Sequence, residues 1–220
     1  AEGGQANVYA FLPTSIAAFQ AINTLLGQDT ELFRATVPFE DSGRSFGAGT
    51  VIVRDDMAAV NQLVDVWALD LFALNDLPEA ITPMARQRIA VYGDPGLRYA
   101  LNKLGFEFDS VETKDLNKGV IAGYDVFVNR GLTWSSLNHD GEDAMTSWYA
   151  AGGNYVGQAY QGGAIDFARD AQWVTGLEYS TISGNAILKL DYTAGDSVAA
   201  GFHADGYAFV YQSVWFTEWP

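Results

Sequence analysis

Cysteine is absent from the 220-residue sequence, and histidine occurs only twice. Without cysteine the chain can form no disulfide, no thiolate metal site and no thiol nucleophile. The absence leaves the cellular compartment open, because many secreted bacterial proteins also lack cysteine.

Basic residues are scarce as well. Twelve Lys and Arg face 27 Asp and Glu, which gives a formal net charge of -15. Such a field repels phosphate backbones and anionic lipid surfaces, so neither nucleic acid nor a membrane is expected as a partner. The sequence also has no apolar run long enough to cross a bilayer, and its start, AEGGQA, is typical of a processed or trimmed end.

Hydrophobic residues make up 49% of the sequence, which predicts a folded globular protein. Residues 1–80 are expected to form a small β-α-β-β-α unit. Residues 7–12 and 30–37 are β-rich, and residues 15–27 carry apolar side chains at helical spacing. A glycine-bearing turn then leads into another strand and into a helix that begins within DDMAAVNQLVDVWALDLFAL.

Two prolines and little periodicity make residues 75–87 the predicted linker to a second domain at 85–220. In that domain apolar strands alternate with helices, which indicates a parallel sheet covered on both faces. The fold expected is α/β: a mostly parallel, doubly wound sheet of the flavodoxin or glutamine amidotransferase-like kind, preceded by the small α+β unit. The aromatic-rich strands after residue 176 predict an antiparallel C-terminal extension.

Ligands collect at the carboxyl ends of parallel strands, where backbone amides and helix N-termini converge. Three strand-to-helix turns, YGDPG, NRGLTWSS and GQAYQGG, should meet at that edge. They predict a binding crevice, although every such sheet has turns of this kind and these can be ordinary ones. The candidate crevice residues are Asp94, Asn129, Arg130, Trp134, Gln158 and Tyr160.

Two further motifs have simpler structural interpretations. The stretch GRSFG matches a nucleophile-elbow pattern around Ser45, but a strand and not a helix follows it, so a hairpin is favoured. The stretch NHDGED places His139 and Glu142 at zinc-site spacing, but it lies at a predicted helix start, where Asn138 or Asp140 can cap. No metal site and no cofactor is therefore expected.

Aromatic residues are abundant, with 6 Trp, 11 Tyr and 13 Phe. Core and edge-strand packing is their commoner use, although one exposed patch that binds a sugar or a peptide is also possible. The tryptophans considered for such a patch are Trp134, Trp148, Trp173, Trp215 and Trp219.

Several phrases of the sequence resemble a known module. They are RIAVYGDPGLRYALNKLGFEFDSV, YDVFVNRGLTWSSLN, AAGGNYVGQAYQGG and DSVAAGFHADGYAFVYQSVWF, with ELFRATVPFEDSGRSFGAGTVIVR before them. They look like the type 1 glutamine amidotransferase-like module attached to secreted bacterial zinc carboxypeptidases of the carboxypeptidase A superfamily. The resemblance covers nearly the whole chain, but it depends on strand and turn phrases and not on a catalytic signature.

The resemblance implies an amidotransferase-like fold that lacks the catalytic nucleophile. In true amidotransferases the turn after the third main strand holds a cysteine, whereas this chain has Gln158, Ala159 and Tyr160 there. A glutamine side chain is not a nucleophile. The carboxypeptidase's own paired zinc motifs are also missing from this sequence. The resemblance therefore implies a non-catalytic accessory module of a secreted protein, which binds a peptide, a glycan or an adjacent catalytic domain.

Two alternatives stay open from the sequence. One is an unrecognised hydrolase that pairs Ser45 or Asp94 with His139 or His203. It requires a histidine nitrogen within hydrogen-bonding reach of a hydroxyl or carboxylate. The other is a purely structural or interaction domain that uses the terminal aromatic residues as its contact surface.

Overall fold

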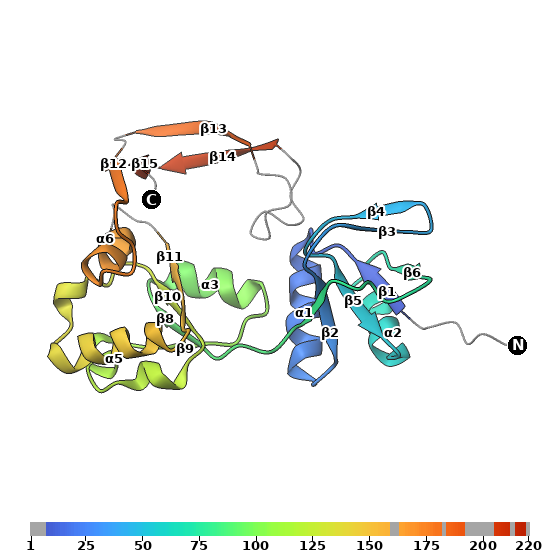
Figure 1. Cartoon of the computed structure of the whole chain (residues 1–220), viewed down its shortest axis with the longest axis horizontal. Helices are drawn as coiled ribbons and strands as arrows, with labels where there is room; N and C mark the ends of the chain where they lie inside the picture. The colour runs from blue at the N-terminus through green and yellow to red at the C-terminus, as the bar shows by residue number, and fades with distance from the viewer. Residues whose placement is uncertain (1–7, 159–162, 182–183, 192–204, 212–213, 219–220) are drawn as a thin grey trace, which may run out of the picture. The chain divides into compact units, whose positions relative to one another are not determined.

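The computed structural model describes residues 8–158, 163–181, 184–191, 205–211 and 214–218 (Figure 1). The chain divides into two compact units. The first comprises Ala1–Arg86, Lys103–Phe106 and Lys189–Tyr207, and the second comprises Gln87–Asn102, Glu107–Leu188 and Ala208–Pro220.

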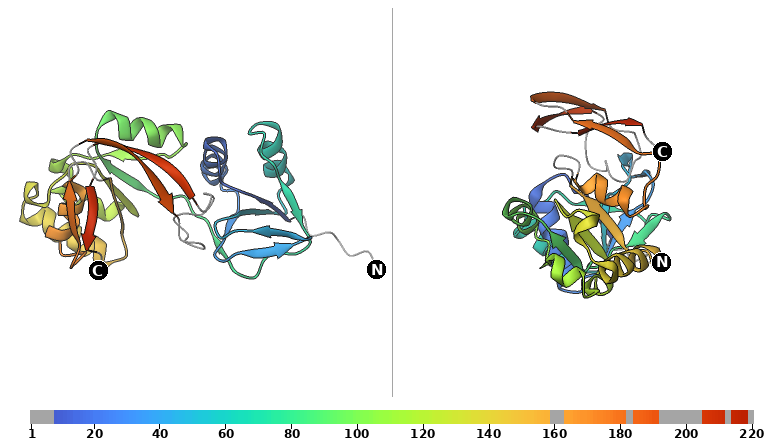
Figure 2. Two further views of the ribbon diagram at one scale, coloured as in Figure 1. Left: turned by 90° about the horizontal axis from the view of Figure 1, so that it is seen from above. Right: turned by 90° about the vertical axis from the view of Figure 1, so that its left-hand side faces the viewer.

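A five-stranded antiparallel sheet forms the centre of the first unit, with the spatial order β6-β1-β5-β2-β7. Figure 2 shows the two helices of this unit on the same side of that sheet. The elements are β1 (Val8–Phe11), α1 (Ile16–Gly27), β2 (Leu32–Ala35), β5 (Val51–Arg54), α2 (Met57–Asp65), β6 (Phe72–Leu74) and β7 (Ile81–Pro83), with a separate hairpin of β3 (Phe39–Asp41) and β4 (Arg44–Phe46).

Alternation along the strands creates a core on each face of this sheet, because successive side chains point to opposite sides. Val51 and Val53 pack in one cluster with apolar residues of both helices. Ile52 lies in a second cluster with Phe33 and with Phe46 of the hairpin. The first unit is thus a two-sided sheet whose second face is covered by the β3–β4 hairpin.

The second helix is shorter than its apolar pattern indicates. It begins where Asp56 accepts a hydrogen bond from the backbone N–H of Ala59 at 2.9 Å, and it ends at Asp65. Ala68 then adopts a left-handed backbone with a φ of 51°, which an α-helix cannot contain. The residues after it form β6, which pairs with β1.

The second unit contains a four-stranded parallel sheet, with the spatial order β11-β10-β8-β9. Helices connect its strands, as parallel pairing requires. The elements are β8 (Ile89–Tyr92), α3 (Pro95–Lys103), β9 (Asp109–Ser110), α4 (Thr113–Leu116), the 3-10 turn η1 (Val120–Gly123), β10 (Val126–Asn129), the 3-10 turn η2 (Trp134–Ser136), α5 (His139–Ala150), β11 (Asn154–Gly157) and α6 (Gly163–Asp170).

Phe127, at the centre of β10, is fully buried and anchors the core of this unit. Met145 and Trp148 of α5 and Phe167 of α6 belong to the same cluster. The indole N–H of Trp148 also donates to the carbonyl oxygen of Tyr124 at 2.7 Å, so the largest side chain of the core has its polar atom satisfied.

The expectation of a mostly parallel, doubly wound sheet with an antiparallel extension was wrong. The main sheet is antiparallel, and among the described residues the only parallel sheet has four strands. β9 is limited to two residues, and β11, which reads as a buried strand, is an exposed edge. Apolar content indicated strands there, but it does not determine how many neighbours a strand has.

The C-terminal strands also do not extend the parallel sheet. β12 (Glu178–Thr181) pairs antiparallel with β15 (Val214–Glu218), and β13 (Asn185–Asp191) pairs with β14 (Asp205–Tyr211). Each is a separate two-stranded ribbon, so the tail is antiparallel in part but is not an extension of the sheet.

Candidate functional site

The carboxyl ends of β8 and β10 lie side by side, because the two strands are adjacent and parallel. The backbone N–H of Arg130 donates to the carbonyl oxygen of Tyr92 at 2.7 Å, one step beyond the last residue pair of the ladder. Two of the predicted turns, YGDPG and NRG, therefore meet at this edge.

Asp94 and Arg130 form an ion pair across the two turns. Asp94 also caps α3, since its Oδ1 accepts from the backbone N–H of Leu97 at 2.9 Å. This backbone hydrogen bond, together with the Arg130 guanidinium, holds the pKa of Asp94 below its ordinary value. Asp94 is thus an ionised carboxylate that stabilises a helix start, and such a group makes a poor general base near neutral pH.

Asn129 is fully buried and fixes the turn that follows β10. Its Oδ1 accepts from the backbone N–H of Leu132 at 2.9 Å, and its Nδ2 donates to the Leu132 carbonyl at 3.2 Å and to the Tyr155 hydroxyl at 3.0 Å. The Tyr155 hydroxyl in turn donates to the carbonyl oxygen of Ala164 at 2.7 Å. Burial raises the pKa of Tyr155, which keeps this hydroxyl protonated.

The remaining crevice candidates do not join this group. Trp134 packs edge-on against Phe167, with ring centroids 5.2 Å apart, and so belongs to an aromatic cluster. The backbone N–H of Gln158 extends the ladder to Asn129 at 2.9 Å, while its side chain is exposed. Tyr160 lies outside the described residues.

A shallow hollow of about 440 Å³ opens at the carboxyl ends of β8 and β9. It contains two basic side chains that the sequence interpretation missed, Arg98 and Lys114. The Nζ of Lys114 donates a hydrogen bond to Oε2 of Glu112 at 2.6 Å, and this bond raises the pKa of the lysine. The Nη1 of Arg98 donates to the Ser110 hydroxyl at 3.5 Å. The hollow can hold a small polar group, but it contains no nucleophile that a base activates.

Among the described residues of the hydrolase alternative, Ser45, Asp94 and His139 do not form a catalytic group. Ser45 lies in β4 of the hairpin, as predicted, and its hydroxyl donates to Glu40 at 3.2 Å. The side chain of His139 is 86% exposed and lies 3.6 Å from Asp143 on its own helix. Asn138 caps that helix by accepting from Gly141, which confirms the capping interpretation of NHDGED. His203 lies outside the described residues.

The described part of the chain contains no group of three or more His, Cys, Asp or Glu side chains that could hold a metal ion. None of the helices in it has the length and apolar character needed to cross a membrane.

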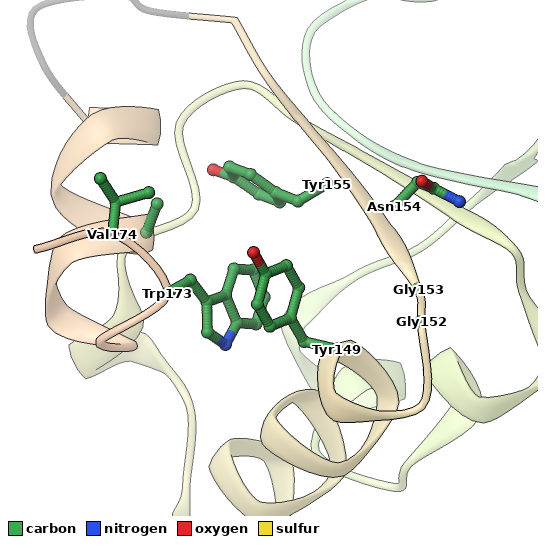
Figure 3. Close-up of a pocket in the computed structure, with 8 residues that line it drawn as sticks. Tyr149, Gly152, Gly153, Asn154, Tyr155, Trp173 and Val174 are labelled. Carbon is green, nitrogen blue, oxygen red and sulfur yellow. The ribbon is translucent and has the colours of Figure 1, made fainter. Parts of the chain in front are cut away.

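A second hollow, of about 600 Å³, lies beside the start of β11 and is lined mainly by aromatic and small residues (Figure 3). Tyr149 stacks on Trp173 with ring centroids 4.3 Å apart and an interplanar angle of 13°. Tyr155 meets the edge of the same indole at 5.3 Å. The described residues that line it are Tyr149, Gly152, Gly153, Asn154, Tyr155, Ala168, Trp173 and Val174. We call it the aromatic pocket.

Of the five tryptophans considered for a patch, Trp173 lines this pocket, and two others pack close to it in the core of the second unit. Trp134 and Trp148 lie 6.1 Å and 6.2 Å from Trp173, measured between ring centroids. The side chain of Trp215 is not described, and Trp219 lies outside the described residues. The three residues belong to separate elements, so only the shared abundance of aromatics pointed to such a cluster.

No protein-family model, curated protein or solved structure matches this chain. Function must therefore be argued from the site itself. In the described residues the polar groups at the carboxyl edge serve as a helix cap, an ion pair and a turn brace, and the aromatic pocket offers apolar surface. This arrangement suits the binding of a ligand better than the activation of a nucleophile.

Proposed function

We propose that the chain is a non-catalytic binding module, and that it belongs to a secreted protein that also carries a zinc carboxypeptidase-like domain. Its role is to hold a peptide, a glycan or the adjacent catalytic domain close to that enzyme. Neither nucleic acid nor a membrane surface is part of this proposal, since the net charge of -15 opposes both.

One observation carries the non-catalytic part of the proposal. At the edge where parallel sheets usually carry chemistry, Asp94 is committed to Leu97 and Arg130. A catalytic base needs a pKa near the working pH, but the backbone N–H of Leu97 and the guanidinium of Arg130 hold the pKa of this carboxylate below its ordinary value.

Asn129, the second polar residue at this edge, is equally committed. The hydrogen bonds of its side chain run to the turn at Leu132 and to Tyr155, and none of its surface is exposed. A side chain in that position braces the fold and cannot reach a substrate.

The family context is supported by the resemblance of the sequence phrases to the module of secreted zinc carboxypeptidases. A module without a nucleophile is also what that resemblance implies, because the chain has Gln158 at the turn where an amidotransferase has its cysteine. Secretion enters the proposal through the same resemblance.

A panel of ester, amide and peptide substrates tests the proposal on the purified chain. We expect no turnover that differs between the unmodified chain and the matched variants Asp94→Asn, Ser45→Ala and His139→Ala. Activity equal in all four proteins identifies a contaminant. Activity that one substitution abolishes, while the circular dichroism spectrum is retained, contradicts the proposal.

The context is tested separately through the full-length gene product. We expect a zinc-peptidase domain in the same polypeptide, and a lower cleavage rate on a long peptide substrate when this chain is deleted. A full-length product that lacks any peptidase domain would remove the family part of the proposal and leave the binding part standing.

A further inference from the structure

β11 lies at one edge of the parallel sheet, with β10 as its only neighbour among the described strands. The backbone N–H groups of Asn154 and Gln158 donate toward β10, to Asp125 and Asn129. Since backbone groups alternate in direction along a strand, the N–H and C=O groups of Tyr155 and Gly157 point the other way. No described strand pairs with these donors and acceptors.

The residues of β11 lack three of the features that protect a sheet edge. Proteins block exposed edges with charged side chains, proline or bulges. The sequence of β11, NYVG, has no charged residue and no proline, and its register with β10 is continuous. Val156 is 50% exposed, so an apolar side chain also faces solvent there.

The aromatic pocket lies along the start of the same strand. Figure 3 shows Tyr155, Trp173 and Val174 on one side of β11, and Asn154 on the other. Gly152, just before the strand, has no heavy atom within 4 Å of where a Cβ would stand, so chain can approach closely at this point. A strand laid beside β11 would therefore carry alternate side chains toward the pocket.

We propose that the outer edge of β11 accepts an extended peptide segment as an added strand, and that one apolar or aromatic side chain of this peptide fills the aromatic pocket. Main-chain hydrogen bonds to Tyr155 and Gly157 supply affinity, and the pocket supplies selectivity. The inference rests on the proposed binding function and names its ligand class.

The charges of the protein indicate which residues the bound peptide should contain. All eight lining residues of the pocket are uncharged, which favours a neutral side chain at that position. The chain as a whole carries -15, so basic residues that flank the apolar position favour association. The ligand class is thus an extended segment with one large apolar residue between flanking Lys or Arg.

The probe is the capped peptide Ac-Lys-Thr-Phe-Thr-Val-Thr-Lys-NH2, titrated into the purified full chain by isothermal calorimetry. We expect saturable binding at one site per chain. Replacing the phenylalanine of the probe by serine should weaken binding about tenfold or more, because a buried phenylalanine side chain is lost. Replacing both lysines by glutamate should weaken it as well, and about 0.5 M NaCl should reduce that difference.

Strand addition requires backbone N–H donors from the peptide, whereas filling the pocket requires only a side chain. A probe N-methylated at the alternate residues whose N–H groups face β11 keeps every side chain but loses the donors of that edge, so it should not bind. Equal binding of the N-methylated probe would mean that only a side chain is held, and it would overturn the inference.

Three variants of the protein complete the test. Tyr149→Ala removes a pocket wall that is 38% exposed, and we expect binding about tenfold weaker. Tyr99→Ala, at a 64% exposed position of α3, is the matched control, with binding changed less than about twofold. Val156→Lys adds a charge to the edge and should also weaken binding of the basic probe without lowering thermal stability.

The outcomes separate this inference from the proposed function. If the probe fails to bind while the chain is still needed by the peptidase, the inference fails and the binding function stands. Sedimentation analysis could instead show a dimer that the substitution Val156→Lys dissociates. That result would assign the edge to a second copy of the chain and would contradict the inference of a peptide ligand. Specific turnover by the chain would instead refute the non-catalytic function.

Discussion

Replacing Asn129 by alanine tests whether the carboxyl edge of the parallel sheet is built for structure. The substitution leaves the N–H of Leu132 without its acceptor at 2.9 Å and the carbonyl of Leu132 without its donor at 3.2 Å. The Tyr155 hydroxyl keeps its bond to Ala164, so it contributes little to the loss.

The magnitude follows from burial. Leu132 is 1% exposed, so water cannot easily replace the lost partners. A buried polar group without a partner is unfavourable by about 1–3 kcal/mol. With one N–H and one weaker carbonyl contact affected, we expect Asn129→Ala to lower the free energy of unfolding by about 2–4 kcal/mol.

Urea unfolding followed by tryptophan fluorescence measures this change, because five of the six tryptophans belong to the second unit. Asn154→Ala is the matched control. Asn154 is exposed, and its side-chain amide donates to the carbonyl oxygen of Asp125 at 3.3 Å. Losing this contact should lower the free energy of unfolding by less than about 0.5 kcal/mol. Equal effects of the two substitutions would refute the role given to Asn129.

Two further predictions concern neighbouring positions. Because the pKa of Asp94 is depressed in the folded chain, its charge stabilises the fold above pH of about 4, and this contribution is lost as the pH falls through the folded-state value. Asp94→Asn should therefore lower the thermal midpoint at pH 7, and the gap between the two proteins should shrink as the pH falls through the folded-state pKa of Asp94; a gap that widens in acid would contradict the assignment. Gly153→Ala should destabilise the second unit by about 1–3 kcal/mol in urea, since a Cβ there would stand 2.1 Å from the Trp148 ring. Gly123→Ala, where a Cβ meets nothing within 4 Å, should change stability by less than about 0.5 kcal/mol, and similar losses at both glycines would show that the contact is not tight.

Local signals in the sequence were enough to place several elements. Pro95 begins α3 with Asp94 as its cap, and Asn138 caps α5, because capping depends on residues three positions apart. The meeting of Asp94 and Arg130 also followed from sequence, since the carboxyl ends of neighbouring parallel strands share one edge.

Pairing between distant segments was not accessible in this way. β12 and β15 pair with each other across more than thirty residues, and nothing in either strand specifies that choice over the parallel sheet. The exposed position of β11 could not be predicted either, because Tyr155 and Val156 would suit a central strand equally well. The aromatic pocket needs Tyr149 and Trp173, which come from different segments and meet only after folding.

The gathering of three indoles in the second unit gives the protein an optical consequence. Trp173 lies 6.1 Å from Trp134 and 6.2 Å from Trp148, at interplanar angles of 76° and 51°. Transition dipoles that are so close and so inclined couple with each other, so the folded unit should show strong ellipticity in the near ultraviolet. That band would vanish when the rings separate, even where helices persist, and it gives a label-free signal for the loss of tight packing.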